Sequence, residues 1–238
     1  IIQQLVYGAP SLKNVTVLEG WTMDNVAEAL EQNIGINKKK FLRLCKDQEL
    51  VKLFDLDGNS FEGYLFPDTY YFTKGTSDIE LLKRAYRRGR EILAKEWESR
   101  DIGLPYKNDY DALIMASIIE KETALASERA MIAGVFVRRL KNNMKLQTDP
   151  TVIYAMGVKY DGNIRKKDLR IDSPYNTYRY GGLPPSPIAL AGREAIHAAL
   201  HPENDDTLYF VSKKDGSHHF SKTLYEHNKA VKKYQLNK

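Results

Sequence analysis

The chain has 238 residues, of which 42% are hydrophobic and 28% are charged, and its formal net charge is +5. This length is enough for one large or two modest domains with real cores, and the composition excludes an intrinsically disordered chain. No apolar run approaches the roughly 20 residues of a membrane span, and the single Cys45 excludes an internal disulfide and a multi-cysteine metal site.

The first third of the chain has the pattern of a small module of strands and helices. Gly35 separates two helical patterns, and Pro67 marks an edge or a bulge in the second strand. A long amphipathic helix, capped by Asp78, then runs to about Arg100 and bridges this module to the remainder. The elements predicted before it are a strand at 14–18, a helix at 23–31 capped by Thr22, a helix from Asn37 to about Cys45, and a strand at 62–72.

The second part of the chain is predicted to be mainly helical, with one hairpin at the Asp-Gly turn of Lys214–Ser217. Asp149 before Pro150 predicts a helix start, and Gly157 suits a left-handed C-cap. The stretch 159–174 is polar and loop-like. The remaining elements are helices at 111–122, from Ser127 to Asn142, at 151–156, at 191–201 and from Ser221 to about Tyr234, and strands at 207–211 and 218–220.

The helix at 111–122 is too apolar all round for a surface helix, which predicts that it lies in a core. Glu120, near its end, shares one face with Leu113, Ala116 and Ser117. Small neighbours leave room for a ligand, and apolar surroundings raise a carboxyl pKa toward neutrality, as a general acid needs. From the residues alone, the alternative is that Glu120 ends a buried helix at the surface, and that Ser117 bonds to its own helix backbone.

Several motifs, in order along nearly the whole chain, are similar to those of one family. The resemblance is to the endolytic murein transglycosylases of the MltG (YceG-like) family. The motifs are E-G-Y-L-F-P-D-T-Y at Glu62–Tyr70, A-S-I-I-E-K-E-T followed by S-E-R and V-F-V-R-R-L, L-Q-T-D-P-T-V-I-Y-A-M-G ending at Gly157, Y-N-T-Y at Tyr175–Tyr178 and G-L-P-P-S-P-I at Gly182–Ile188.

The resemblance implies an α+β protein. It would comprise a small LysM-like βααβ module at 1–75, a connecting helix at 76–106, and a mainly helical YceG-like catalytic domain with a small β-sheet at 107–238. It also implies that Glu120 is the catalytic acid/base. Aromatic rings, amides and hydroxyls suit sugar binding, and the candidate substrate-binding residues are Ser117, Gln147, Thr148, Tyr175, Asn176, Thr177, Tyr178 and Glu62.

The implied activity is endolytic, non-hydrolytic cleavage of the MurNAc–GlcNAc β-1,4 bond of peptidoglycan, leaving 1,6-anhydro-MurNAc ends and terminating nascent glycan strands. The partners expected from the family are glycan strands and peptidoglycan synthases. The chain opens at Ile1 without Met, and the family leads us to expect a preceding single-pass membrane anchor, with the body on the outer face of the inner membrane. No nucleic-acid motif is present, so no nucleic-acid partner is expected.

Two alternatives remain open at this stage. A glycoside hydrolase needs a second carboxylate, and the candidates are Glu122, Glu128, Asp149, Glu62 and Asp68. A non-catalytic glycan-binding or scaffold protein would bind without turnover. The pair His197 and His201 is spaced i, i+4 as zinc ligands can be, but no Glu follows His197 as H-E-x-x-H requires, so we expect neither a metal nor a cofactor.

Overall fold

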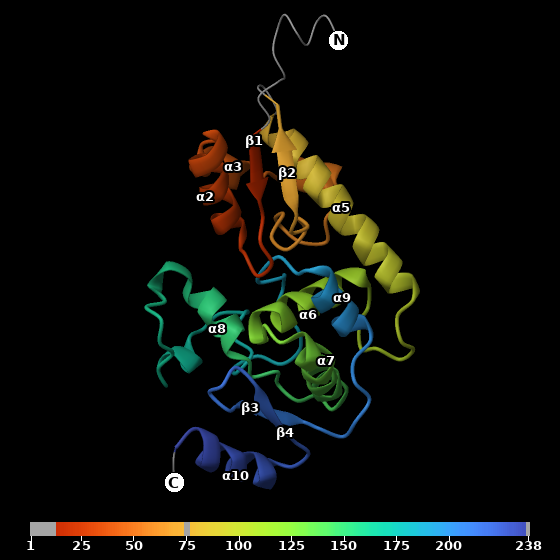
Figure 1. Cartoon of the computed structure of the whole chain (residues 1–238), viewed down its shortest axis with the longest axis vertical. Coiled ribbons are helices and arrows are strands. Elements are labelled where there is room, and N and C mark those ends of the chain that lie inside the picture. Colours follow the sequence, from red (N-terminus) through yellow and green to blue (C-terminus); the bar gives the residue numbers. More distant parts are fainter. Residues whose placement is uncertain (1–12, 74–76, 237–238) are drawn as a thin grey trace, which may run out of the picture.

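The computed structural model describes residues 13–73 and 77–236, which form an α+β fold with two separate two-stranded antiparallel sheets (Figure 1). The first sheet lies at one end of the molecule, and the second, with the last helix, lies at the other end. The N-terminal module contains β1 (Lys13–Thr16), α2 (Met23–Ile34), α3 (Lys38–Leu44), α4 (Gln48–Leu53) and β2 (Thr69–Phe72).

The long helix α5 (Asp78–Glu98) runs along one side of the molecule, from the module to the larger part (Figure 1). The larger part is built around α6, as Figure 1 shows. Its elements are α6 (Asp109–Glu122), α7 (Ala126–Lys141), α8 (Asp149–Met156), the short 3-10 helices η1 (Gly157–Lys159) and η2 (Asp168–Arg170), α9 (Arg193–Leu200), β3 (Tyr209–Ser212), β4 (His218–Ser221) and α10 (Leu224–Tyr234).

The expected βααβ order of the module lacks one helix. The short helix α4 lies between α3 and β2, so the order is β-α-α-α-β. Asp47 caps α4 by accepting hydrogen bonds from the backbone N–H groups of Glu49 and Leu50. Because α4 has only six residues and buries only Val51, its apolar periodicity is too weak to stand out from the sequence.

The predicted strand at 62–72 was wrong over its first seven residues. Only Thr69–Phe72 forms β2, paired with β1 so that Val15 faces Tyr70. Before it the chain turns, because Gly63 has a φ of +82° and a Cβ there would collide with Pro187. Tyr64 and Leu65 are both buried although they are adjacent, which a half-buried strand does not allow.

Five predicted helix termini were also wrong in detail. Three predicted N-caps lie one or two residues from the observed ones. The N-cap of α5 is Ser77 instead of Asp78, that of α7 is Leu125 instead of Ser127, and that of α10 is Thr223 instead of Ser221. Asp149 is the first residue of α8 and Thr148 is its N-cap. Gly157 has the expected positive φ, but its ψ of −127° lies outside the left-handed helical region, and the chain continues into η1.

Two hydrophobic clusters form the interior. One joins β1, α2, β2 and the start of α5, and the other surrounds α6; Leu56 and Tyr86 pack against both. The loop after β1 also pairs with the segment before α9, because Gly20 donates to Leu190 O at 2.8 Å and Leu190 donates to Trp21 O at 2.7 Å. These bonds bring the N-terminal module against the end of α6, since Lys121 Nζ donates to Gly20 O at 3.1 Å.

Candidate active site

The site is organised by α6, which starts at the N-cap Asn108 and buries every residue from Ala112 to Ile119. The predicted core helix is therefore confirmed. Glu120 is the first residue after this buried run, and only 6% of its side chain is exposed. A carboxylate in this position must be bonded or protonated, because burying an unpaired charge costs several kcal/mol.

Two groups from other segments hold the Glu120 carboxylate. Gly192 N–H donates to Oε2 at 2.9 Å, and Arg129 Nη2 lies 3.8 Å from Oε1. Gly192 is the N-cap of α9, so its N–H belongs to the set of donors that a helix start offers to an anion. Arg129 lies in the first turns of α7, and its Nε is buried without a hydrogen-bond partner among the described residues.

Glu19 lies beside this pair and was missed by the sequence analysis. A Cβ added to Gly192 would collide with the Glu19 carboxylate, so the two Glu carboxyl groups converge on this glycine. Glu19 is in the loop after β1, and the only local signal there, Glu-Gly, indicates a turn. The contact joins segments far apart in the chain, so no short motif could reveal it.

Burial raises the pKa of Glu120, and the negative charge of Glu19 raises it further. The Gly192 N–H bond, Arg129 and Lys121 act in the opposite direction, and the net pKa is raised. A carboxyl group balanced in this way can hold a proton closer to neutral pH and can also lose it, which is what an acid that later acts as a base requires.

Glu122 lies on the opposite face of α6. Its Oε2 accepts a hydrogen bond from the Thr148 hydroxyl at 2.9 Å, and burial raises its pKa to about 7. It lines a cavity of about 440 Å³ between α6, β3 and α10, together with Gln147, Asp149 and Tyr178. This is a second buried carboxyl environment, separate from that of Glu120.

The predicted substrate-binding residues therefore fall into different places. Gln147 and Tyr178 line the cavity at Glu122, and Thr148 bonds to Glu122 itself. Asn176 and Thr177 are buried. The Asn176 amide donates to Leu169 O and Ile171 O, while Thr177 accepts from Thr148 N and pairs with Thr151. These two residues hold the loop against α8.

Ser117 and Tyr175 also have partners within the fold. The Ser117 hydroxyl donates to Ile114 O at 2.7 Å and accepts from Ile188 N at 3.0 Å, so it joins α6 to the Pro-rich segment instead of bonding to Glu120. The Tyr175 hydroxyl lies 2.6 Å from Ser186 Oγ. The Tyr175 ring packs against Tyr154, with centroids 4.8 Å apart.

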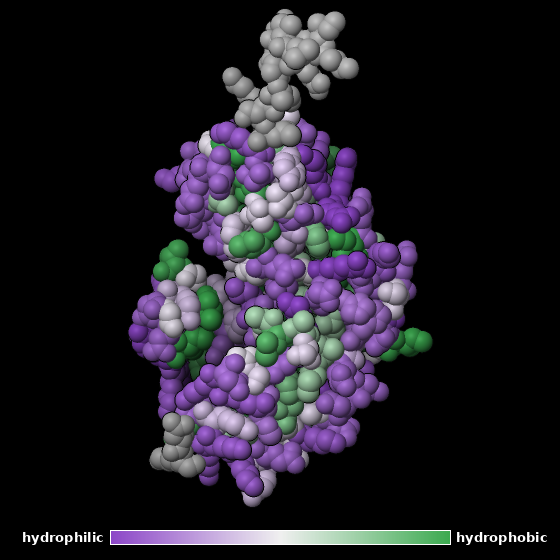
Figure 2. Space-filling view, viewed as in Figure 1, coloured by the Kyte–Doolittle hydropathy of each residue, from purple (hydrophilic) through white to green (hydrophobic). Residues whose placement is uncertain are grey.

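Glu62 joins the N-terminal module to α8. Its Oε1 accepts from Met23 N at 3.0 Å, which caps α2, and its Oε2 accepts from the Tyr154 hydroxyl at 3.4 Å. Burial raises its pKa to about 7, although both bonds lower it. The segment that includes α8, η1 and η2 forms a lobe, and Figure 2 shows a hollow between this lobe and the rest of the molecule.

The other candidate second carboxylates are engaged elsewhere. Glu128 accepts from His218 N and bonds to His218 Nδ1 at 2.7 Å. Asp149 accepts from the Tyr178 hydroxyl at 2.6 Å, so its side chain bonds to an aromatic residue and not to the helix start as predicted. Asp68 Oδ1 accepts from Thr69 N at 2.7 Å. Glu19 is the carboxylate that the structure adds to the site.

No helix within residues 13–73 and 77–236 combines the length and the apolar character needed to cross a bilayer.

Comparison with known proteins matches residues 1–233 to the YceG-like family. A Bacillus subtilis (strain 168) protein named endolytic murein transglycosylase is 38% identical over 249 residues, covering 98% of this chain and 69% of its own length. A protein of the same name from Streptococcus pneumoniae (strain ATCC BAA-255 / R6) is 30% identical, and the match covers 93% of this chain and 44% of that protein.

A crystal structure of a yceG-like protein from Listeria monocytogenes has the same fold, with a TM-score of 0.81 at 37% identity, over 95% of this chain and 77% of that one. The shared fold and the names of these relatives define an enzyme of the lytic transglycosylase class. The chain belongs to the YceG-like family.

Proposed function

We propose that the protein is an endolytic lytic transglycosylase that cleaves the MurNAc–GlcNAc β-1,4 bond within peptidoglycan strands, with Glu120 as its acid/base. The observation that carries the proposal is the environment of Glu120. It is a nearly buried carboxyl group with a raised pKa, balanced between a peptide N–H, a guanidinium and a second carboxylate. The names of the relatives support murein as the substrate.

The reaction uses one proton twice. Protonated Glu120 gives its proton to the glycosidic oxygen, and the bond from that oxygen to C1 of MurNAc breaks. The Glu120 carboxylate then takes the proton of the MurNAc C6 hydroxyl, whose oxygen attacks C1 and closes the 1,6-anhydro ring. No water is consumed, and Glu120 ends protonated as it began.

The neighbours of Glu120 suit these two half-reactions. When Glu120 is ionised after the first step, Gly192 N–H and Arg129 stabilise the carboxylate. The charge of Glu19 opposes that of the Glu120 carboxylate, and a negative group near C1 would stabilise an oxocarbenium-like carbon there. Acid/base catalysis contributes about 10²- to 10⁴-fold, so sugar distortion and electrostatic stabilisation supply the rest.

We further propose that the module ending at β2 is LysM-like and binds or orients glycan. Its loop after β1 supplies Glu19 and bonds to the segment before α9, which supports a role for it in completing the site. Of the predicted substrate-binding residues, Gln147 and Tyr178 line the cavity at Glu122, and Figure 2 shows a hollow beside the lobe that contains α8.

The same proposal includes the location and the partner proteins that we expect from the family. We expect a single-pass anchor in the inner membrane, catalysis on its outer face, and work beside peptidoglycan synthases to terminate nascent strands. These expectations concern the whole protein in its cell and need tests there, such as co-purification with synthases and measurement of glycan strand length.

Mass spectrometry of peptidoglycan digested by wild type and by Glu120→Gln tests the activity. We expect anhydro-MurNAc ends from wild type and no cleavage by the variant. The nearness of Glu19 favours one rival, a hydrolase in which Glu19 activates water; that rival predicts reducing ends. Equal cleavage by wild type and Glu120→Gln would reject Glu120 as the acid, and binding without cleavage by wild type would indicate a scaffold.

A further inference from the structure

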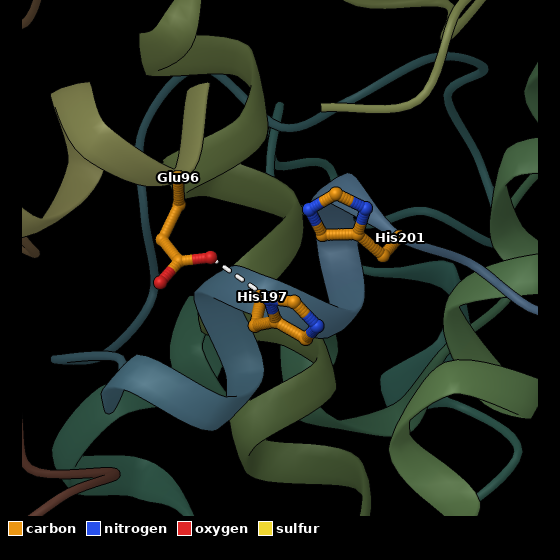
Figure 3. A group of neighbouring side chains, drawn as sticks. All are labelled: Glu96, His197 and His201. Atoms are coloured by element: carbon orange, nitrogen blue, oxygen red, sulfur yellow. Dashed lines mark hydrogen bonds and ion pairs between the residues drawn. The ribbon is translucent and has the colours of Figure 1, made fainter. Parts of the chain in front are cut away.

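A second cluster of ionisable side chains lies where the end of α5 meets α9. It consists of Glu96, His197 and His201, drawn in Figure 3, and one oxygen or nitrogen atom of each lies within 4.8 Å of the other two. The sequence predicted no metal here, because no Glu follows His197. The structure supplies the missing carboxylate from α5, a different helix.

The Glu96 carboxylate is held by two side chains of α9. Only 6% of its side chain is exposed, and Arg193 Nε donates to its Oε1 at 3.0 Å while His197 Nδ1 lies 2.8 Å from its Oε2. Arg193 occupies one carboxylate oxygen and leaves the other facing His197.

One ring nitrogen of His201 has no hydrogen-bond partner in the part of the chain that the structure describes. Asp101 Oδ1 lies 3.1 Å from His201 Nδ1, which fixes the ring, and the opposite nitrogen, Nε2, is buried with no hydrogen-bond partner among the residues that the structure describes. A carboxylate on one imidazole nitrogen and a free second nitrogen is the arrangement that orients histidine metal ligands. The His197 and His201 ring centroids are 4.3 Å apart, so the two imidazole rings lie next to each other.

We propose that Glu96, His197 and His201 form a binding site for Zn²⁺. Two imidazoles and one carboxylate are a donor set that Zn²⁺ takes at about 2.0–2.2 Å, with water as the fourth ligand. Tetrahedral ligands at that length lie about 3.4 Å apart, so Glu96 and His197 must separate by about half an ångström and His201 must move inward. Side-chain rotation supplies such shifts, since the side chain of His197 is 54% exposed and that of His201 23%.

An ion bound at this position would link two helices near Glu120. It would join the end of α5 to α9, and α9 begins directly after Gly192, whose N–H bonds to Glu120. The hard cation Mg²⁺ prefers an octahedron of oxygen ligands, so this donor set disfavours it.

Isothermal titration of chelator-treated protein with Zn²⁺ tests the site. We expect one Zn²⁺ per chain, no comparable binding of Mg²⁺, and a loss of at least about tenfold in affinity in His201→Ala. His219→Ala is the matched control, because His219 lies in β4 and packs on Tyr234 of α10. The affinity of this variant for Zn²⁺ should equal that of wild type. No binding at about 100 µM Zn²⁺, or equal affinity in His201→Ala, would overturn the proposal.

Thermal unfolding with and without Zn²⁺ separates binding from misfolding. Zn²⁺ should raise the Tm of wild type and of His219→Ala by several degrees, since a ligand that binds only the folded state stabilises it. It should not raise the Tm of His201→Gln, which keeps a polar side chain at this position. An equal rise in all three proteins would place the ion elsewhere and reject the site.

Discussion

Glu120 and Glu122 are two residues apart on α6, yet about 200° of helical rotation directs them to opposite sides. Burial raises the pKa of both. Glu120 lies near two charged groups of opposing influence from other segments, the Arg129 guanidinium and the Glu19 carboxylate. The hydrogen-bond partner of Glu122 is the neutral Thr148 hydroxyl.

The difference shows that a raised pKa alone does not identify a catalytic acid. Burial dominates at Glu122 and brings its pKa to about 7, which makes this carboxyl group a pH-dependent part of the core. At Glu120 the charges of Arg129 and Glu19 act on the pKa in opposite directions. We therefore expect substitutions on the two faces to affect different properties.

The largest expected effect separates the two residues by activity. Glu120→Gln should lower the rate of glycan cleavage by about 10²- to 10⁴-fold or more, because it removes the proton donor while keeping the shape. Glu122→Gln should keep the rate within about tenfold of wild type. Release of anhydro-MurNAc ends measures both variants, and a larger loss in Glu122→Gln than in Glu120→Gln would reverse our assignment.

The next effect is on stability and belongs to Glu122. Its folded pKa of about 7 exceeds the ordinary Glu value, so its favourable contribution is full below about pH 4.3 and is lost as the pH rises through 7. Glu122→Gln resembles the protonated acid and should escape that loss. Its free energy of unfolding should exceed that of wild type by an amount that grows to about 4 kcal/mol by pH 8.

Chemical denaturation at several pH values measures this difference. The exposed Glu98→Gln is the matched control and should differ from wild type by a constant amount across the same range. A flat difference for Glu122→Gln would show that Glu122 stays ionised in the folded protein at low pH, contrary to the effect of its burial.

A smaller pair of effects tests the opposing charges at Glu120. Arg129→Gln removes a group that lowers the pKa of Glu120, so the alkaline limb of the pH–rate profile should move to higher pH. Glu19→Gln removes a group that raises this pKa, so the limb should move to lower pH. Each variant should change the rate near the limb by less than about tenfold, since tenfold corresponds to a full pKa unit.

The direction of these shifts is more informative than the loss of rate, because either substitution can also weaken sugar binding. Shifts of the same sign in both variants would show that the limb reports another group. Glu62 would then be the first candidate for the group that the alkaline limb reports, since burial raises its pKa to about 7 as well.

The sequence could predict α6 and its burial because its apolar residues leave no polar face. It could not predict the partners of Glu120. Glu19, Arg129 and Gly192 come from three segments that meet only through tertiary packing. The assignment of Asp149 as a cap failed for a related reason, because its carboxylate is used by Tyr178 from another loop.

The stretch before β2 illustrates the same limit. Its aromatic and apolar residues favour a strand by composition, but Gly63 packs on Pro187 and Glu62 caps α2, and these two contacts turn the chain. Local propensity is overridden where distant segments compete for the same residues.

The smallest predicted effect tests what holds Glu122. Thr148→Val keeps the shape of the side chain and removes the hydroxyl that donates to Glu122 Oε2. A hydrogen bond to a charged group contributes about 1.5–3 kcal/mol and a neutral one about 1 kcal/mol. The variant should therefore lose about 1 kcal/mol of stability at pH 5 and about 2 kcal/mol at pH 8, as denaturation curves would show. Equal losses at both pH values would mean that the charge of Glu122 does not change across this range, and the contrast with Glu120 would then rest on activity alone.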